Sequence, residues 1–534
     1  MHDHKSFMSE KTLNRSDKSR RLQLAAVFVT YFTAFFVTNS LNIALPRIVA
    51  DMNGMAYYSW AVSIPALATA IATLIFGKLS DMYGRRVILL VATGFILAGA
   101  VLSAVSQTFV FMILTLSLLS LGQGVLPPLC FSVLGDLYTS TDRSFWAGLM
   151  NIPSAIAAFI VPTLSGWIVD NLSWRFTFWL DAPLAILTAL IVMIALPTFE
   201  KHQTHRIDIR GSILLAGAAS TMILAFSLAG STFAWNSTQI LGLLSVSAIF
   251  WVLFFFAEAR HPEPLFDPHH VKNRILVTSS LAAVMSTFGI TAIVVYFPLF
   301  LQGVLGLSAT ASGKILTPFN LLLAVMGIPA GLLIARTKRY KWMYLLGYAL
   351  LTIVMISMTV FQSRITVRTG YLFTVLFGLG LGTIPTINAL VVQYSVPRKM
   401  LGAATGGLYF IIAMGKSFAP AILGSAMNMV YARELTASLP LRLDKFLDQE
   451  TMNTLTNPRI LLSAQALEDL QNIFSKSGKP AIDIFYQTVE MIRSSLGSAL
   501  HVVFLVSAVA MFASFLLILT IPEISLTAGP KGKN

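Results

Sequence analysis

Long apolar runs alternate with short polar segments along almost the whole chain. Each run has about the ~20 residues that a helix needs to cross the hydrocarbon core of a bilayer. The pattern predicts an all-α polytopic membrane protein. Its fourteen predicted spans lie at 22–46, 58–77, 87–107, 109–135, 146–169, 175–197, 211–231, 239–257, 275–301, 310–334, 342–361, 370–394, 402–430 and 497–521.

Composition agrees with this class. The 534 residues are 56% hydrophobic and only 11% charged, whereas a soluble protein carries about 25% charged residues. The single cysteine, Cys130, excludes an intramolecular disulfide. Residues 1–21 are polar and show no cleavable signal pattern, and the first apolar run is too long for the apolar region of a signal peptide.

The distribution of Lys and Arg predicts the orientation. Loops assigned to the inside, together with both tails, carry 24 of these residues, and the short loops assigned to the outside carry four. Short cytoplasmic loops collect positive charge, so we expect both termini in the cytoplasm. The net charge of +14 is then explained by topology and by an anionic lipid surface. The bilayer, and not nucleic acid, is the expected partner of this charge.

Internal repetition predicts two related halves. The segment 331–341 follows span 10 as Gly77–Arg86 follows span 2, with a leading glycine and a basic cluster, although Ala335 aligns with Asp81. Spans 7 and 8 then form an insertion between two six-span halves, and duplicated halves around a midplane site are typical of transporters. The predicted units are a tail 1–21, an N-terminal bundle 22–200, an inserted pair 201–272, a C-terminal bundle 273–521 and a tail 522–534.

The most specific motif is Gly-Lys-Leu-Ser-Asp-Met-Tyr-Gly-Arg-Arg at 77–86, which we expect to form a tight cytoplasmic loop. It resembles the loop between spans 2 and 3 of the major facilitator superfamily. Further runs resemble the same superfamily. They are Asn42-Ile-Ala-Leu-Pro46, Gln123-Gly124, Trp174-Arg175-Phe176 with Pro183, and the segment from Pro162 to Gly166.

The arrangement of six, two and six spans is similar to the fourteen-span drug:proton antiporters of that superfamily. The resemblance implies two six-helix bundles plus two inserted helices in a bacterial inner membrane. It also implies export of small amphipathic compounds by proton antiport with alternating access, no cofactor, and no enzymatic activity. The residues Pro162 and Gly166 would belong to the motif that helps to seal the outer side in such antiporters.

Three positions depart from the family pattern. Val37 stands where the family usually has an acid in span 1, Ser120 where it usually has an arginine in span 4, and Asp181 where it usually has an asparagine. The first two positions are linked to proton coupling and binding in the family. The usual coupling chemistry is therefore not expected here.

Two sets of residues are candidates for function. The first is the conformational-switch loop of Gly77, Asp81, Gly84, Arg85 and Arg86 with Asp136 as partner, because opposite charges that are partly dehydrated attract strongly. The second set holds candidates for proton coupling or substrate binding: Lys416, Asp181, Asn42, Gln123 and Asn388.

Alternatives remain for each candidate. The loop could serve only topology, and Asp136 could be an unrelated interfacial acid. Lys416, near the middle of span 13, could carry a proton, attract an anionic substrate group, or bond only to backbone carbonyls freed by Pro420. Asp181 could simply pair with Arg175, and the polar span residues could be helix–helix hydrogen-bonding groups.

Other functions also remain open. The protein could export one dedicated metabolite, such as a siderophore or an organic anion, or be a membrane-embedded enzyme or a receptor. The sequence offers no phosphate-binding loop, and its histidine pairs lack the neighbours of a metal site. The hydrophilic segment 431–496 is expected to form short amphipathic helices at 461–474 and 482–492 on the outer surface. It could dock a periplasmic adaptor protein or be a tolerated insertion.

Overall fold

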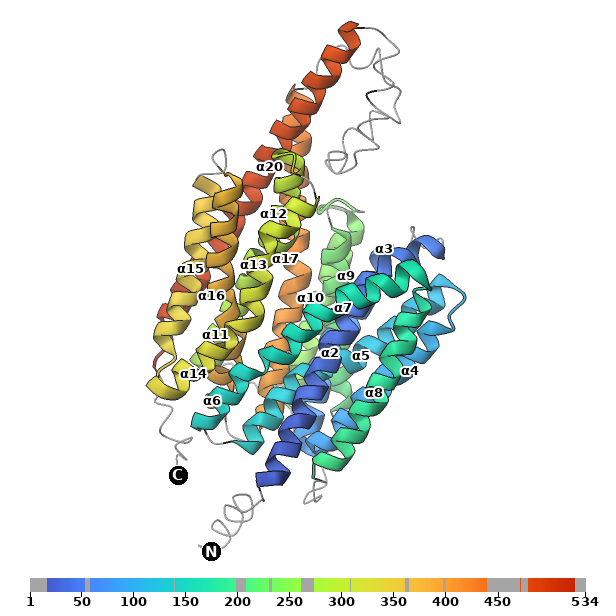
Figure 1. Ribbon diagram of the computed structural model, residues 1–534, viewed down its shortest axis with the longest axis vertical. Coiled ribbons are helices and arrows are strands. Elements are labelled where there is room, and N and C mark those ends of the chain that lie inside the picture. The colour runs from blue at the N-terminus through green and yellow to red at the C-terminus, as the bar shows by residue number, and fades with distance from the viewer. Residues whose placement is uncertain are drawn as a thin grey trace, which may run out of the picture.

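A computed structural model of the chain is entirely helical in its main elements (Figure 1). Within the described residues it has thirteen helices long and apolar enough to cross a membrane, and a shorter apolar helix at Arg210–Phe226. These account for the fourteen predicted spans. The described residues are 17–52, 58–138, 140–197, 208–229, 233–260, 273–307, 309–360, 365–396, 400–438, 471 and 479–523.

The first half contains six spans, of which the fifth is broken at Met150. Its helices are α2 (Asp17–Asp51), α3 (Tyr58–Tyr83), α4 (Arg85–Ala104), α5 (Phe109–Leu137), α6 (Ser140–Leu149), α7 (Asn151–Asn171) and α8 (Arg175–Ala195). Two further helices form the inserted pair, α9 (Ile209–Leu228) and α10 (Thr238–Glu258).

The second half repeats this plan, with its tenth span broken at Met326. Its first span runs from α11 (Arg274–Thr291) through η3 (Ala292–Tyr296) and α12 (Phe297–Leu299) to η4 (Phe300–Val304). The remaining helices are α13 (Ala309–Val325), α14 (Gly327–Thr337), α15 (Lys341–Val360), α16 (Val367–Tyr394), α17 (Leu401–Ser438) and α20 (Lys479–Leu519).

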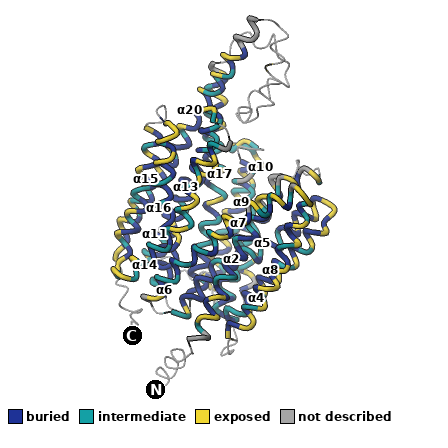
Figure 2. Tube along the Cα trace, viewed as in Figure 1, coloured by how far each residue is buried: buried dark blue, intermediate teal, exposed yellow. Residues whose placement is uncertain are grey.

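Each helix buries one stripe and exposes another (Figure 2). On α8, Phe178 and Asp181 are buried, while Trp179 and Ile194 on other faces are exposed. Large exposed apolar side chains of this kind occur on most outer helices. Such a surface suits lipid tails, which are as apolar as the side chains themselves.

The two halves meet along two equivalent seams. Gly77 of α3 packs against α17, where a Cβ atom on Gly77 would lie 2.8 Å from the Gly402 carbonyl oxygen. Gly331 of α14 packs against α6 in the same way, next to Gly148. Gly331 therefore holds in the second half the place that Gly77 holds in the first, as the sequence repeat predicts. We call the end of the bundle at which α3 ends and α17 begins the charged end.

The inserted pair lies beside one of these seams. Apolar residues of α9 and α10, including Leu215 and Phe254, form one buried cluster with Leu74 of α3 and Phe410 of α17. Nearer the other end of the bundle, the ring centroids of Phe226 and Phe418 are 4.4 Å apart. The pair thus contacts both halves.

Helices α17 and α20 extend beyond the bundle as a stalk (Figure 1). We call this the stalk end, opposite the charged end; α2 begins and α20 ends at the charged end. Residues 482–492, expected as a separate surface helix, belong to the continuous helix α20. Tyr431, Leu435 and Ile492 are buried where the two helices leave the bundle, so the apolar stripe of this segment serves helix packing. The other expected surface helix, 461–474, lies outside the described residues except Gln471, as do residues 1–16 and 524–534 of the two tails.

The expected loop at 77–86 is mostly helix. Helix α3 continues to Tyr83, and α4 begins at Arg85, so Gly84 alone separates them. Gly84 has φ of 89°, a conformation that glycine adopts without strain. The connection is therefore a one-residue turn, and the charges of the motif lie on helical turns whose positions are fixed.

Candidate functional site

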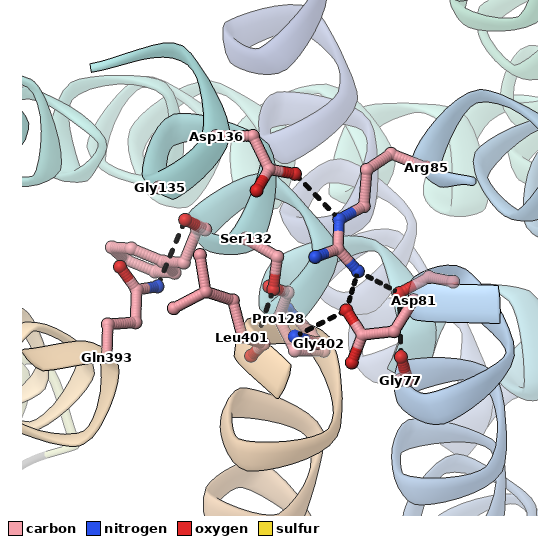
Figure 3. A network of polar contacts seen from close by, with 12 residues as sticks. Gly77, Asp81, Arg85, Pro128, Ser132, Gly135, Asp136, Gln393, Leu401 and Gly402 are labelled. Carbon is pink, nitrogen blue, oxygen red and sulfur yellow. Dashed lines mark hydrogen bonds and ion pairs between the residues drawn. The ribbon is translucent and has the colours of Figure 1, made fainter. Parts of the chain in front are cut away.

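A compact charged network lies at the charged end (Figure 3). It consists of Asp81 and Arg85 of the 77–86 motif and Asp136 of α5. The Arg85 guanidinium is 2.5 Å from the Asp81 carboxylate and 2.9 Å from that of Asp136. It also donates to the Ser80 hydroxyl at 2.6 Å. Asp81 and Arg85 are largely buried, whereas 41% of the Asp136 side chain is exposed. The predicted association of these three residues is present.

Asp81 also binds the second half of the protein. One carboxylate oxygen accepts a hydrogen bond of 3.0 Å from the Gly402 backbone N–H, and the other accepts one of 2.7 Å from Ala403. These donors belong to the first turn of α17, where backbone N–H groups lack helical partners and the helix dipole favours an anion. Asp81 is thus an anionic cap for a helix of the other half.

Close backbone packing makes this cap possible. A Cβ atom on Gly402 would meet the Arg85 guanidinium, and would lie 2.5 Å from the Gly77 carbonyl oxygen and 2.7 Å from Asp81 Oδ1. One on Gly406 would lie 2.6 Å from the Thr73 carbonyl oxygen. Only glycine at these positions lets α17 approach α3 so closely.

Further hydrogen bonds join the halves at this end. Gln393 donates to the Phe131 carbonyl oxygen at 3.0 Å, and Asn151 donates to the Thr386 hydroxyl at 3.1 Å. The Ser132 hydroxyl donates to the Leu401 carbonyl oxygen at 3.5 Å. These bonds and the Asp81 cap would all have to break for the charged end to open.

The face of α17 that points toward the first half becomes steadily more exposed toward the stalk end. Along this stripe Thr405 is fully buried, Tyr409 is partly buried, and Lys416 and Pro420 are exposed. Helix α2 shows the same change, because Tyr31 is buried, Thr38 is intermediate and Asn42 is exposed. The halves are therefore closed together at the charged end and exposed from the middle outward. We call this exposed region the central opening.

Aromatic rings lie where the seam closes. Tyr31 and Phe131 meet edge to face with ring centroids 5.8 Å apart, and Tyr409 of the second half lies 6.4 Å from Phe131. Farther toward the stalk end, the Gln123 amide donates a hydrogen bond to the Thr38 hydroxyl. We call the three rings the aromatic floor of the central opening.

Asp181 lies apart from this opening, inside the first half. Only 1% of its surface is exposed, and neither carboxylate oxygen has a hydrogen-bond partner among the described residues. The expected alternative, a pair with Arg175, is wrong, because Arg175 donates to the Ser106 carbonyl oxygen at 2.9 Å and stacks on Trp174.

The remaining candidates occupy different places. Asn388 is buried within the second half and accepts a hydrogen bond from Tyr344, so it is a helix–helix contact there. Arg86 is half-buried beside the network. Gly166 has open space where a side chain would be, and the side chain of Pro162 is outside the described parts. Their role as an outer seal stays a prediction.

Sequence reasoning missed two parts of this site. Arg143 is buried, donates to the Gly135 carbonyl oxygen at 2.6 Å and lies over the Tyr394 ring. The spacing Gly402-x-x-x-Gly406 was available as a signal, since small residues four apart mark close helix contacts. The hydrogen-bond donors to Asp81 are backbone N–H groups of α17, and the residue types in the sequence do not reveal such donors.

Two repeated six-helix halves, closed together at one end and exposed at the other, are typical of a membrane transporter. The chain belongs to the Major Facilitator Superfamily, whose family model matches residues 27–420. This membership makes the protein a multi-pass membrane transporter rather than an enzyme.

The curated relatives include efflux proteins. The chain is 27% identical over 494 residues to the multidrug transporter protein MdtP of Bacillus subtilis, covering 91% of this chain and 90% of the relative. It is 27% identical to multidrug resistance protein 3 of the same organism, covering 73% and 76%, and 28% identical to the efflux pump FUS6 of Gibberella moniliformis, covering 79% and 77%.

Solved structures confirm the fold. The human organic anion transporter MFSD10 superposes with a TM-score of 0.57 at 14% identity, covering 89% of this chain and 99% of that chain. The proton:xylose symporter XylE superposes with a TM-score of 0.57 at 10% identity, covering 97% and 99%. At these identities the similarity concerns the fold alone.

Proposed function

We propose that this protein exports small amphipathic compounds by secondary active transport, driven by proton antiport. The observation that carries the proposal is the one-sided central opening, with the aromatic floor at its closed end and polar groups above it. Aromatic rings beside a few hydrogen-bonding groups suit ligands that combine an apolar body with a polar group. The multidrug and efflux relatives support the direction of transport.

We further propose that Asp181 carries the coupling proton. Helices α2 and α8 run in opposite directions, and Thr33 and Thr188 meet across them with hydroxyl oxygens 2.7 Å apart. Ser40 lies seven residues after Thr33 on α2, and Asp181 lies seven residues before Thr188 on α8. Because the two helices are antiparallel, Ser40 and Asp181 lie at the same level. Both are buried, and within the part of the chain that the structure describes neither side-chain group has a hydrogen-bond partner. An unpaired carboxylate is costly in apolar surroundings, so binding a proton would stabilise Asp181 while it is enclosed.

The orientation completes the proposal. With the charged end in the cytoplasm of a bacterium and the stalk outside the inner membrane, the central opening faces outward, and the loop charges follow the positive-inside rule. The network of Asp81 with α17 would then hold the outward-facing state. An adaptor contact through 431–496 stays a prediction, because most of that segment lies outside the described residues.

Accumulation in cells tests the proposed export. Cells that lack their own major efflux pumps would express the wild-type protein or Asp81→Asn, and ethidium and 2-naphthoate would be measured inside them. We expect the wild-type protein to lower the accumulation of at least one of the two compounds, and an uncoupler to abolish the difference. Unchanged accumulation of both compounds, at confirmed membrane expression, would contradict the proposal.

A further inference from the structure

Lys416 stands at the centre of the exposed region between the two halves. It lies seven residues beyond Tyr409 on α17, which is two helical turns or about 10 Å toward the stalk end. Its side chain is exposed. It forms no ion pair or hydrogen bond with any described residue.

The first half supplies polar groups at the same level. Thr38 lies seven residues beyond Tyr31 on α2, which runs parallel to α17, and Gln123 lies eight residues from Phe131 on the antiparallel helix α5. Phe131 contacts both Tyr31 and Tyr409, so the three rings mark one level of the bundle. Lys416, Thr38 and Gln123 each lie seven or eight residues farther toward the stalk end and are therefore level with one another. The hydrogen bond between Gln123 and Thr38 shows that the levels on α2 and α5 agree.

These groups leave donors available for a ligand. The Thr38 hydroxyl donates to the Ala34 carbonyl oxygen at 2.7 Å and accepts from the Gln123 amide. An amide carries two donor hydrogens, so one hydrogen of Gln123 remains. The Lys416 ammonium has three donors, all unused among the described residues.

The local charge is of one sign. Between the charged end and the stalk, the membrane-spanning parts of α2, α5 and α17 and the span that contains α11 carry no acidic residue, and Lys416 is their one charged side chain. The acids Asp81 and Asp136 are bound to Arg85 at the charged end. A cation placed in this way favours an anionic ligand and disfavours a cationic one.

We propose that Lys416 and Gln123 bind the carboxylate, sulfonate or phosphate group of an aromatic amphipathic substrate, whose ring system lies on the aromatic floor. This inference rests on the proposed function and specifies its substrate class. An ammonium and an amide at one level can each donate to an anionic oxygen. The rings below them contribute apolar and stacking contacts.

Binding to the purified full-length protein in lipid nanodiscs tests this inference without requiring transport. The probes are radiolabelled 2-naphthoate, naphthalene-2-sulfonate and 2-naphthyl phosphate, with the cation 2-naphthylmethylammonium as the matched probe of opposite charge. We expect at least one anion to bind the wild-type protein more tightly than the cation. We expect Lys416→Gln to weaken that binding about tenfold or more, and Lys416→Arg, which keeps the charge, to stay within about threefold.

The control variant is Lys341→Gln, which removes an equal charge from the first turn of α15 at the charged end and should leave anion binding unchanged. Equal anion affinity in the wild-type protein and Lys416→Gln would overturn the inference, as would a lack of binding of all three anions. Lys416-dependent anion binding without proton-driven transport would support the binding site and overturn the proposed exporter, so the two failures are distinct.

Discussion

Substitution of Gly402 by alanine should open the charged end. The added methyl group would lie against the Arg85 guanidinium, 2.5 Å from the Gly77 carbonyl oxygen and 2.7 Å from Asp81 Oδ1. The Gly77 oxygen belongs to the backbone, so α3 and α17 must separate. Separation also weakens the hydrogen bonds of 3.0 and 2.7 Å from Gly402 and Ala403 to Asp81.

The expected magnitude follows from these two effects. Overpacking a close contact costs about 1–3 kcal/mol, and each hydrogen bond to a charged group contributes about 1.5–3 kcal/mol. The two effects overlap because the same movement relieves one and breaks the other. We therefore expect the state closed at the charged end to lose about 2–4 kcal/mol relative to the open state, which changes the ratio of the two states about thirtyfold to a thousandfold.

Thiol accessibility measures this ratio. The natural Cys130 is buried, so Asn42→Cys, in the central opening, would be the main reactive thiol. In purified protein, Gly402→Ala should slow its reaction with a hydrophilic maleimide at least tenfold. The control is Gly94→Ala, where a methyl group meets nothing within 4 Å. Equal labelling rates in the wild-type protein and in both variants would refute the assigned role of the Gly402 contact.

The remaining predictions concern the charged residues and the topology. Asp81→Asn and Arg85→Ala should insert normally but transport about tenfold more slowly, because Asp81 bonds directly to α17 and Arg85 holds the Asp81 carboxylate in place. Asp51→Asn, which breaks only an exposed ion pair, should have no effect. A normal transport rate in both network variants, at equal expression, would show that the motif serves topology alone. Asp181→Asn should abolish proton-driven uphill export but retain substrate exchange without a gradient, and uphill export at the wild-type rate would remove Asp181 from coupling. Reporter fusions should place both termini inside and 431–496 outside; a cytoplasmic signal from that segment would contradict the orientation.

The sequence predicted the membrane-spanning framework closely because run length is a direct consequence of bilayer thickness. The predicted span 175–197 corresponds to α8, Arg175–Ala195, and most other ends agree within a few residues. The main exceptions are the ends of α3 and α17, at Tyr83 and Ser438, and the start of α20 at Lys479, where polar residues continue the helices beyond the apolar runs. A hydrophobic pattern marks where a helix meets lipid, whereas the stalk helices bury apolar residues such as Tyr431 where they leave the bundle.

The site was predictable only in part. The charges of Asp81, Arg85 and Asp136 were recognisable because their motif is specific, but the ligands on Gly402 and Ala403 are backbone N–H groups. Lys416 was found by its sequence position, yet whether it is dehydrated or exposed depends on which way α17 faces. Asp181 shows the same limit, since its lack of a hydrogen-bond partner among the described side chains and backbone groups depends on the packing of α2 and α8.

Proton movement that depends on substrate is the most direct test of proton-coupled export. The protein would be reconstituted into liposomes that contain a pH-sensitive dye, with no membrane potential, and ethidium or 2-naphthoate would be added on one side. We expect that at least one compound drives proton flux in the wild-type protein, and that Asp181→Asn transports the compound down its gradient without moving protons. Substrate transport by the wild-type protein with no accompanying proton flux would contradict this expectation.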